Sequence, residues 1–244
     1  ERVFPAVAAA DWRRARSSID EAIEVNRRSG YGDYRTWFVA HLGWVARMQG
    51  RYEEALALGR RAVDASAQQG HRWWRPTAQA LLATSLRKAG RTAEAADLLT
   101  EALAELGPDG APAPRLRCLA ELAAATGSRT LLDEADAALS AISVPPGSAW
   151  LVGSDAYLAV ARCWLTLGSP ERAGTIVAGL LRAAERQRWI PVLADAELVQ
   201  GLIATALGDA RAGVTSLTRA RDLARRHGMA NIEHEAQAML AAAR

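Results

Sequence analysis

The sequence predicts an all-α fold in which about five to six helix hairpins stack into a solenoid. A short phrase, GRYEEA at 50–55 in its clearest copy, recurs with starts near residues 10, 50, 90, 127, 168 and 208. Apolar residues fall at helical spacing on both sides of Gly50, and this glycine permits a tight turn between two helices. Each period of 37 to 41 residues therefore fits one hairpin, which buries its apolar face only against its neighbours.

The helices follow from this register along the chain. The first helices of the hairpins are expected near 36–49, 75–89, 115–126, 153–167 and 193–207. The second helices are expected near 11–28, 51–68, 91–105, 128–142, 170–186 and 209–226. Residues 229–243 predict a final unpaired helix that covers the end of the core, and 1–9 is too short and too interrupted by proline to be a full first helix. Residues 1–244 are expected to form a single solenoid domain.

Each hairpin is expected to close through one small residue from each of its helices. In the first complete hairpin these are Gly43 and Ala55. A large side chain at either position would force the two helices apart, at a cost of about 1–3 kcal/mol. The same size rule holds for Ala83 with Ala95, Ala161 with Ala173, and Gly201 with Gly213.

This pattern resembles the tetratricopeptide repeat, whose signature is a large residue, Leu-Gly, Gly-x-Tyr and two alanines one helical face apart. The resemblance implies a right-handed α-α superhelix. It is closest at 36–63 and weakest at 113–139, where Leu132 replaces the small residue. Repeats near 40 residues are similar to those of bacterial signal-transduction ATPases and LuxR-like regulators. The matching residues at 36–63 are Val39, Leu42, Gly43, Gly50, Tyr52, Ala55 and Ala62.

Composition and charge argue against several classes of protein. The net charge is +3, the charges are scattered, and all but one of the 30 basic residues are arginine, which favours a GC-rich genome over a nucleic-acid binder. Cys118 and Cys163 fall in apolar helical stretches and are expected to be buried free thiols in a reducing, cytoplasmic compartment. No signal peptide or membrane span is visible. Because the first residue is Glu1, the chain is expected to be a fragment or a processed product.

No motif in the sequence points to a reaction. It contains no Walker or G-x-G-x-x-G phosphate loop, no C-x-x-C, no H-E-x-x-H and no G-x-S-x-G elbow. His227 and His234 are seven residues apart, but Gly228 interrupts the helix between them, and two ligands make a poor metal site. We therefore expect no catalysis, no metal and no cofactor. Arginine pairs on the second helices are expected to be solvated on the outer face.

The resemblance implies that the first helices line a concave groove, where ligands of this family lie. A peptide or protein segment, or a small effector, is the expected partner. For Trp37 and Trp44, a role in the groove and a role in packing between helices are both open. The predicted groove residues are Trp37, His41, Trp44, Arg47, Thr84, Arg87, Arg117, Glu121 and Arg162.

Three functions remain in competition at this point. The first is a non-catalytic binding module of a larger cytoplasmic bacterial regulator, in transcription or signalling, without direct binding of nucleic acid or membrane. The second is a structural scaffold with an empty groove, which forms homo-oligomers through its end helices or its convex surface. Exposed apolar residues on 229–243 would favour it. The third is a small-molecule enzyme with Glu121, Arg117 and Arg162 as its polar groups.

Overall fold

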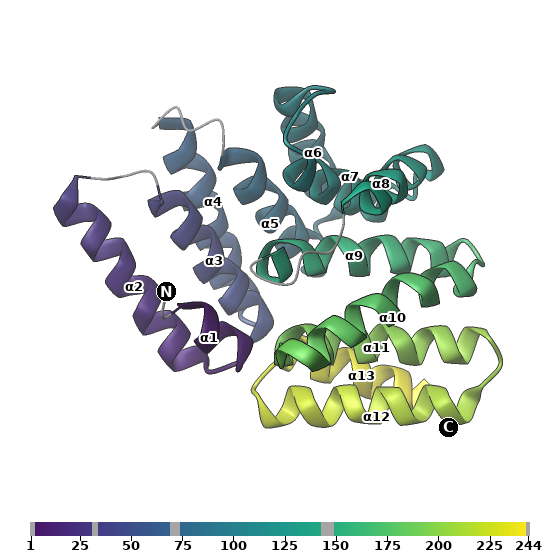
Figure 1. The fold of residues 1–244 in the computed structure, drawn as a ribbon. Coiled ribbons are helices and arrows are strands. Elements are labelled where there is room, and N and C mark those ends of the chain that lie inside the picture. The colour runs from purple at the N-terminus through teal and green to yellow at the C-terminus, as the bar shows by residue number, and fades with distance from the viewer. Residues whose placement is uncertain (1–2, 31–33, 69–73, 143–148, 243–244) are drawn as a thin grey trace. The chain divides into compact units, whose positions relative to one another are not determined.

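The computed structural model describes residues 3–30, 34–68, 74–142 and 149–242, apart from the side chains of 149–152. These residues form thirteen helices and no strand, which confirms the all-α prediction (Figure 1). Helices α3 to α12 make five consecutive hairpins, and α13 follows them. The helices are α1 (Val3–Ala8), α2 (Trp12–Ser29), α3 (Arg35–Met48), α4 (Tyr52–Gln68), α5 (Arg75–Lys88), α6 (Thr92–Leu106), α7 (Pro112–Thr126), α8 (Arg129–Ala141), α9 (Ala149–Thr166), α10 (Pro170–Gln187), α11 (Ile190–Ala206), α12 (Ala210–Arg226) and α13 (Ala230–Ala242).

The chain divides into two compact units. Unit 1 contains Glu1–Val3 and Trp12–Ile142, and unit 2 contains Phe4–Asp11 and Ser143–Arg244. Unit 1 therefore holds α2 to α8, and unit 2 holds α9 to α13 together with most of α1. That the two units act as one solenoid domain stays a prediction.

Within each unit the first helices form an inner layer. In unit 1, α3 packs on α5 and α5 packs on α7, and in unit 2, α11 packs on both α9 and α13. Successive second helices make at most marginal contact with one another in the described residues. Because the first helices touch and the second helices are spread apart, each unit curves with its first helices inside.

The close approach of the two helices in a hairpin is confirmed. A Cβ added to Gly43 would lie 3.2 Å from the carbonyl oxygen of Ala55, and one added to Gly201 would lie 2.6 Å from Cγ of Leu217. Ala83, Ala95, Ala161 and Ala173 are fully buried at the corresponding positions. Small residues therefore set the spacing of the helices along the chain.

Helices α7, α9 and α11 begin three or four residues earlier than predicted. Pro112 is the first residue of α7 and Pro191 lies in the first turn of α11. Proline fits this turn, because its missing N–H is not needed there and its fixed φ is helical. For α9 the extra turn begins at Ala149.

The prediction of two buried free thiols is only half right. Both cysteines lie outside any disulfide, and Cys118 is buried, but Cys163 is partly exposed. Cys163 follows Arg162 on the inner layer of unit 2, one residue before the buried Trp164. Helical rotation therefore turns it away from the core that Trp164 enters.

Candidate functional site

The inner layer carries nearly all the buried polar side chains of the described residues. Of thirteen buried polar or charged residues, eleven lie on first helices, and nine of these lie on α3, α5 and α7 of unit 1. Burying polar groups costs free energy unless they are satisfied. A hairpin needs no such groups for packing, so these first helices differ from an ordinary apolar core. The nine are Thr36, His41, Arg47, Thr77, Gln79, Thr84, Ser85, Arg117 and Glu121.

Aromatic rings gather at the N-terminal end of this layer. Trp37 is half-buried and stacks on His41 with ring centroids 3.9 Å apart, and the centroid of Trp74 lies 6.4 Å from that of Trp37. The carbonyl oxygen of Trp37 lies 2.7 Å from Nδ1 of His41, which fixes the imidazole along α3. Trp37 and Trp74 are therefore both partly accessible at this end of the layer.

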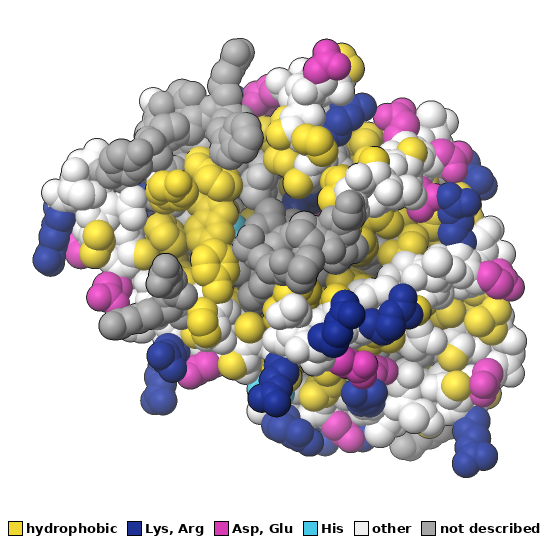
Figure 2. All heavy atoms as spheres, viewed as in Figure 1, with side chains coloured by type: hydrophobic (Ala, Val, Ile, Leu, Met, Phe, Trp, Pro, Cys, Tyr) yellow, Lys and Arg dark blue, Asp and Glu magenta, His cyan; other side chains and the backbone are white. Residues whose placement is uncertain are grey.

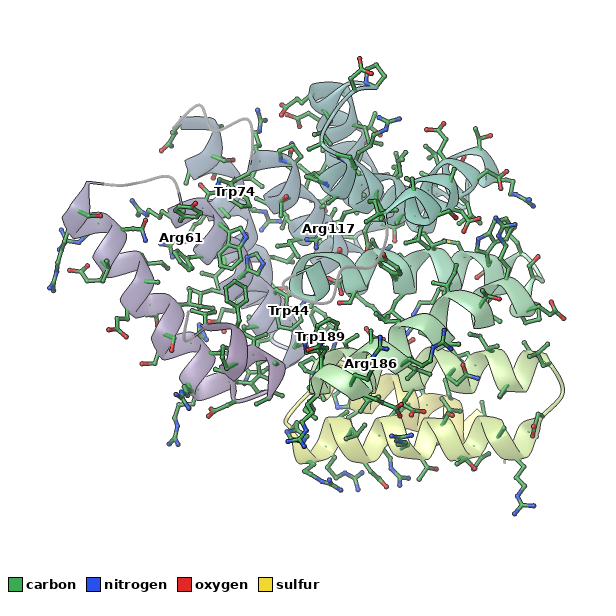
Figure 3. All side chains as sticks on the ribbon, in the orientation of Figure 1. Trp44, Arg61, Trp74, Arg117, Arg186 and Trp189 are labelled. Atoms are coloured by element: carbon green, nitrogen blue, oxygen red, sulfur yellow. The ribbon has the colours of Figure 1, made fainter. Side chains whose placement is uncertain are left out.

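Trp44 has a different environment. It is 4% exposed, and its ring meets that of Trp12 edge-on at 6.0 Å between centroids. Its indole Nε1 has no hydrogen-bond partner among the described residues. The contact with Trp12 supports the packing interpretation of Trp44, because it joins α2 to α3 across the first hairpin boundary. Trp44 is labelled in Figure 3.

An ion pair connects α5 to α7 on the same layer. The guanidinium of Arg87 donates from Nε and Nη2 to Oε2 of Glu121, at 3.0 and 2.9 Å. Glu121 is 1% exposed, whereas Arg87 keeps about a fifth of its side chain accessible. One turn earlier on α5, Oγ1 of Thr84 donates to the carbonyl oxygen of Ala80 at 2.9 Å. Arg87 is thus the accessible charged group beside a buried carboxylate.

Two further arginines lie deep in this layer. Arg47 on α3 and Arg117 on α7 are 2% and 1% exposed. Gln79 on α5 is fully buried, and neither its Oε1 nor its Nε2 has a hydrogen-bond partner among the described residues. A buried amide without partners costs about 1–3 kcal/mol, so Gln79 is an uncompensated polar group in the wall of α5.

The inner layer of unit 2 is closed by its own ion pairs. Nη1 of Arg162 on α9 donates to Oε1 of Glu235 on α13 at 2.5 Å, and Nη2 donates to Oδ1 of Asp195 on α11 at 3.4 Å. Burial lowers the pKa of the Arg162 guanidinium, but the charges of Glu235 and Asp195 outweigh it, so the net shift is upward. Arg162 therefore ties three first helices together as a permanent cation.

A buried carboxylate also lies inside the hairpin of α11 and α12. Oε1 of Glu197 is 2.8 Å from Nη1 of Arg219, and the side chain of Glu197 is 6% exposed. Burial raises the pKa of Glu197, against the opposing effects of Arg219 and a hydrogen bond from Ser216. This group is structural, because both of its partners come from the facing helix α12.

The structure places eight of the nine predicted site residues on α3, α5 and α7 of unit 1, and Arg162 on α9 of unit 2. It brings together Trp37 with His41, and Arg87 with Glu121. Whether these residues bind a ligand stays a prediction.

Sequence reasoning missed Gln79, Glu197 and Glu235. Gln79 and Glu197 replace the large apolar signature residue at the repeat position of Val39, and Glu235 continues the series of Asp155 and Asp195 at intervals of 40 residues. The repeat register would have shown all three.

In the described part of the chain, no group of three or more His, Cys, Asp or Glu side chains is arranged to hold a metal ion. No described helix has the length and apolar character that crossing a membrane requires.

The family model of the tetratricopeptide repeat matches residues 41–104. No protein of curated function matches the sequence. Among solved structures, BtubC (BKLC) from P. vanneervenii is 18% identical, with a TM-score of 0.52 over 87% of this chain and 90% of that chain. A kinesin light chain candidate with nearly identical TPR-like repeats, from Podosopora anserina, is 19% identical, with a TM-score of 0.48 over 79% and 95%. A tetratricopeptide repeat protein from Parabacteroides merdae is 13% identical, with a TM-score of 0.41 over 96% of both chains.

At this level of identity the similarity to BtubC concerns the fold alone. It agrees with the stacked hairpins of both units and with the small-residue contacts inside them. The family model therefore identifies tetratricopeptide repeats at residues 41–104, and the hairpins outside this range share their helix-pair architecture.

Proposed function

We propose that this chain is a non-catalytic binding module that takes a peptide or protein segment on the inner layer of unit 1. The observation that carries the proposal is the gathering of nine buried polar side chains on α3, α5 and α7. Tetratricopeptide repeats generally mediate contacts between proteins, which fits this placement. The accessible groups at the edge of the layer are Trp37 and Arg87, an aromatic anchor and a cation of the kinds that dominate binding energy at interfaces.

In this proposal the module belongs to a larger cytoplasmic bacterial regulator, in transcription or signalling, with repeats near 40 residues as the supporting feature. Occupancy of the inner layer would be transmitted as a small change in the curvature of the repeats. A small effector on the same face is the variant of this function that the aromatic stack of Trp37 and His41 favours.

The self-associating scaffold lacks the observation that would favour it. Met229 and Ile232 are buried, and Met239 and Leu240 are half-buried, so α13 offers a second copy little more than alanines and these two partly covered side chains. The enzyme hypothesis likewise gains nothing from Glu121, because its carboxylate is held by Arg87.

The test is a selection of random dodecapeptides, displayed on phage, against the purified chain. Selected peptides are then measured against Trp37→Ala and Arg87→Ala, and against Arg91→Ala as the matched control. Arg91 also forms an ion pair, with Glu94, but at the start of the second helix α6. We expect Trp37→Ala and Arg87→Ala to weaken binding about tenfold or more, and Arg91→Ala to leave it unchanged.

Thermal unfolding of each variant separates loss of binding from loss of fold. If no peptide is enriched, or if the selected peptides bind wild type and both inner-layer variants equally, the inner layer is not the binding face.

A further inference from the structure

The C-terminal end of α10 departs from the repeat pattern at two positions, and both departures add positive charge. Twenty residues after each phrase start, five of the six repeats have glycine, and the remaining one has Arg188. Fourteen residues after the start, Glu24, Asp64 and Asp222 stand in three of the repeats, where α10 has Arg182. Both changes are independent of the inner layer discussed above.

The backbone shows that Arg188 occupies a glycine position. It ends α10 in the left-handed region, at φ 56° and ψ 43°, and the N–H of Trp189 donates to the carbonyl oxygen of Ala184 at 2.9 Å. Gly228 plays the same role after α12, at φ 63°, where the N–H of Met229 donates to the carbonyl oxygen of Ala224 at 2.8 Å. An L-residue is strained in this conformation, and glycine is its usual occupant.

This strain is rare in the molecule. Among the non-glycine residues that the structure describes, only Ala10 and Arg188 have a positive φ. Strain of this kind persists where the surrounding structure enforces it, and it clusters at functional sites. A cation near a helix C-terminus gains from the helix dipole, which accounts for Arg186, but a glycine at 188 would end the helix without strain.

The acid that Arg182 replaces is one that can pair with the arginines at the end of the helix. On α2, Glu24 accepts hydrogen bonds from both terminal arginines, Arg27 and Arg28, at 2.7 to 2.8 Å. On α10 the corresponding residue is Arg182, which lies one turn before Arg186 on the same helical face and repels it. At this position α10 therefore lacks the acid that pairs with the terminal arginines of α2.

The acids nearby are already occupied by other arginines. Glu185 is bonded to Arg219, and Asp222 to Arg221. Arg182, Arg186, Arg188 and Arg226 are exposed, and none of them forms an ion pair within the described residues. Arg226 holds the repeat position of Arg186 on α12. Figure 2 shows basic side chains gathered over α10 and the C-terminal end of α12, and Figure 3 labels Arg186.

We propose that these four arginines, the α10 arginine patch, form a second docking surface, which binds a carboxylate-rich segment of a partner protein. Guanidinium groups pair with carboxylates through two parallel hydrogen bonds, so four of them suit a short acidic stretch. A nucleic-acid strand would need an extended basic stripe, whereas Glu185, Asp222 and Glu233 interrupt the positive charge around the patch.

The experiment measures fluorescence anisotropy of a fluorescein-labelled deca-glutamate peptide with the whole chain, at low and physiological salt. The double variant Arg182→Glu/Arg188→Gly gives α10 the two residues that α2 has at these positions. The matched control, Arg60→Glu/Arg61→Gln, changes two exposed arginines of α4 by the same net charge. We expect the first variant to weaken binding about tenfold or more and the control less than about twofold.

The proposal is overturned if the peptide does not bind, or if the control loses as much affinity as the α10 variant, because net charge alone would then explain the binding. It is also overturned if a ten-nucleotide oligothymidylate binds more tightly than the peptide and loses its affinity in the α10 variant. Unfolding curves should show that Arg182→Glu/Arg188→Gly is at least as stable as wild type. A loss of binding in this variant is then not caused by a loss of fold.

Discussion

At the scale of single residues, Glu197 gives the chain a pH dependence of known sign. Burial raises its pKa, so the folded chain holds this proton to higher pH than the unfolded chain does. Its contribution therefore favours folding at low pH and is lost as the pH rises through the raised pKa. We expect Glu197→Gln, which keeps the shape and the hydrogen bonds, to gain stability relative to wild type between about pH 4 and pH 7, measured by urea unfolding.

Glu94 serves as the control, because its pKa is shifted in the direction opposite to that of Glu197. The hydrogen bond from Arg91 lowers the pKa of Glu94, so its contribution is present at neutral pH and is lost on acidification. Glu94→Gln should therefore lose stability relative to wild type over the same range. If both variants shift in the same direction, the pH dependence does not come from these two carboxyls.

Cys118 should be inert while the chain is folded. Burial raises the pKa of its thiol to about 12, and Sγ donates to the carbonyl oxygen of Pro76 at 3.8 Å. Since the thiolate is the reactive form, N-ethylmaleimide at about pH 8 should modify Cys118 at least about a thousandfold more slowly than an exposed cysteine. The Cys163→Ser variant retains only Cys118. Mass spectrometry of this variant after labelling, native and in urea, therefore measures the modification of Cys118 alone. Rapid native labelling would contradict the burial.

At the scale of the hairpin, Gly201 tests the spacing of α11 and α12. Alanine usually stabilises a helix relative to glycine, but a Cβ at Gly201 would lie 2.6 Å from Cγ of Leu217. We expect Gly201→Ala to lower the free energy of unfolding by about 1–3 kcal/mol through overpacking. In Gly179→Ala on α10, where nothing lies within 4 Å, the same change should raise it by about 0.5–1 kcal/mol. Equal effects at the two sites would refute the close approach.

At the C-terminal end of α10, replacing Arg188 is expected to stabilise the chain, whereas most single substitutions destabilise a protein. Relief of the left-handed strain is worth about 1–2 kcal/mol, and the greater freedom of glycine in the unfolded chain offsets about 0.5–1 kcal/mol of it. Arg188→Gly alone should therefore raise the free energy of unfolding by up to about 1.5 kcal/mol. Gly228→Ala, at the same position of the next repeat, should lower it. Denaturant unfolding of both variants checks the pair.

The elements were predictable from sequence where a local rule governs them. The period of the repeats and the glycines at the turns located every hairpin from α3 to α12, because those signals act within one hairpin. The N-termini of α7 and α11 were placed too late, because Pro112 and Pro191 look like helix breakers until they are seen in the first turn. The partial exposure of Cys163 was missed because the phase of the helix was not applied to it.

At the scale of the whole molecule, the sequence located the candidate face but not its interactions. The register put Trp37, His41, Arg87 and Glu121 on first helices, and the structure adds the stack and the ion pair. These pairings join residues on one helix face or on neighbouring first helices, so they depend on rotamers that a repeat pattern does not encode. The assignment of one continuous groove from Trp37 to Arg162 stays a prediction, because those residues belong to different units.

The inner layer has a mechanical consequence. Within the described residues, backbone contacts between helices mostly join partners at most two helices apart along the chain, and the ion pair of Arg162 on α9 with Glu235 on α13 is a longer-range link. Under tension such a unit is expected to unfold one hairpin after another, rather than in a single cooperative step. Stretching the chain between its ends in optical tweezers should give a series of small extensions at low force. A single large extension would mean that long-range contacts make each unit unfold cooperatively.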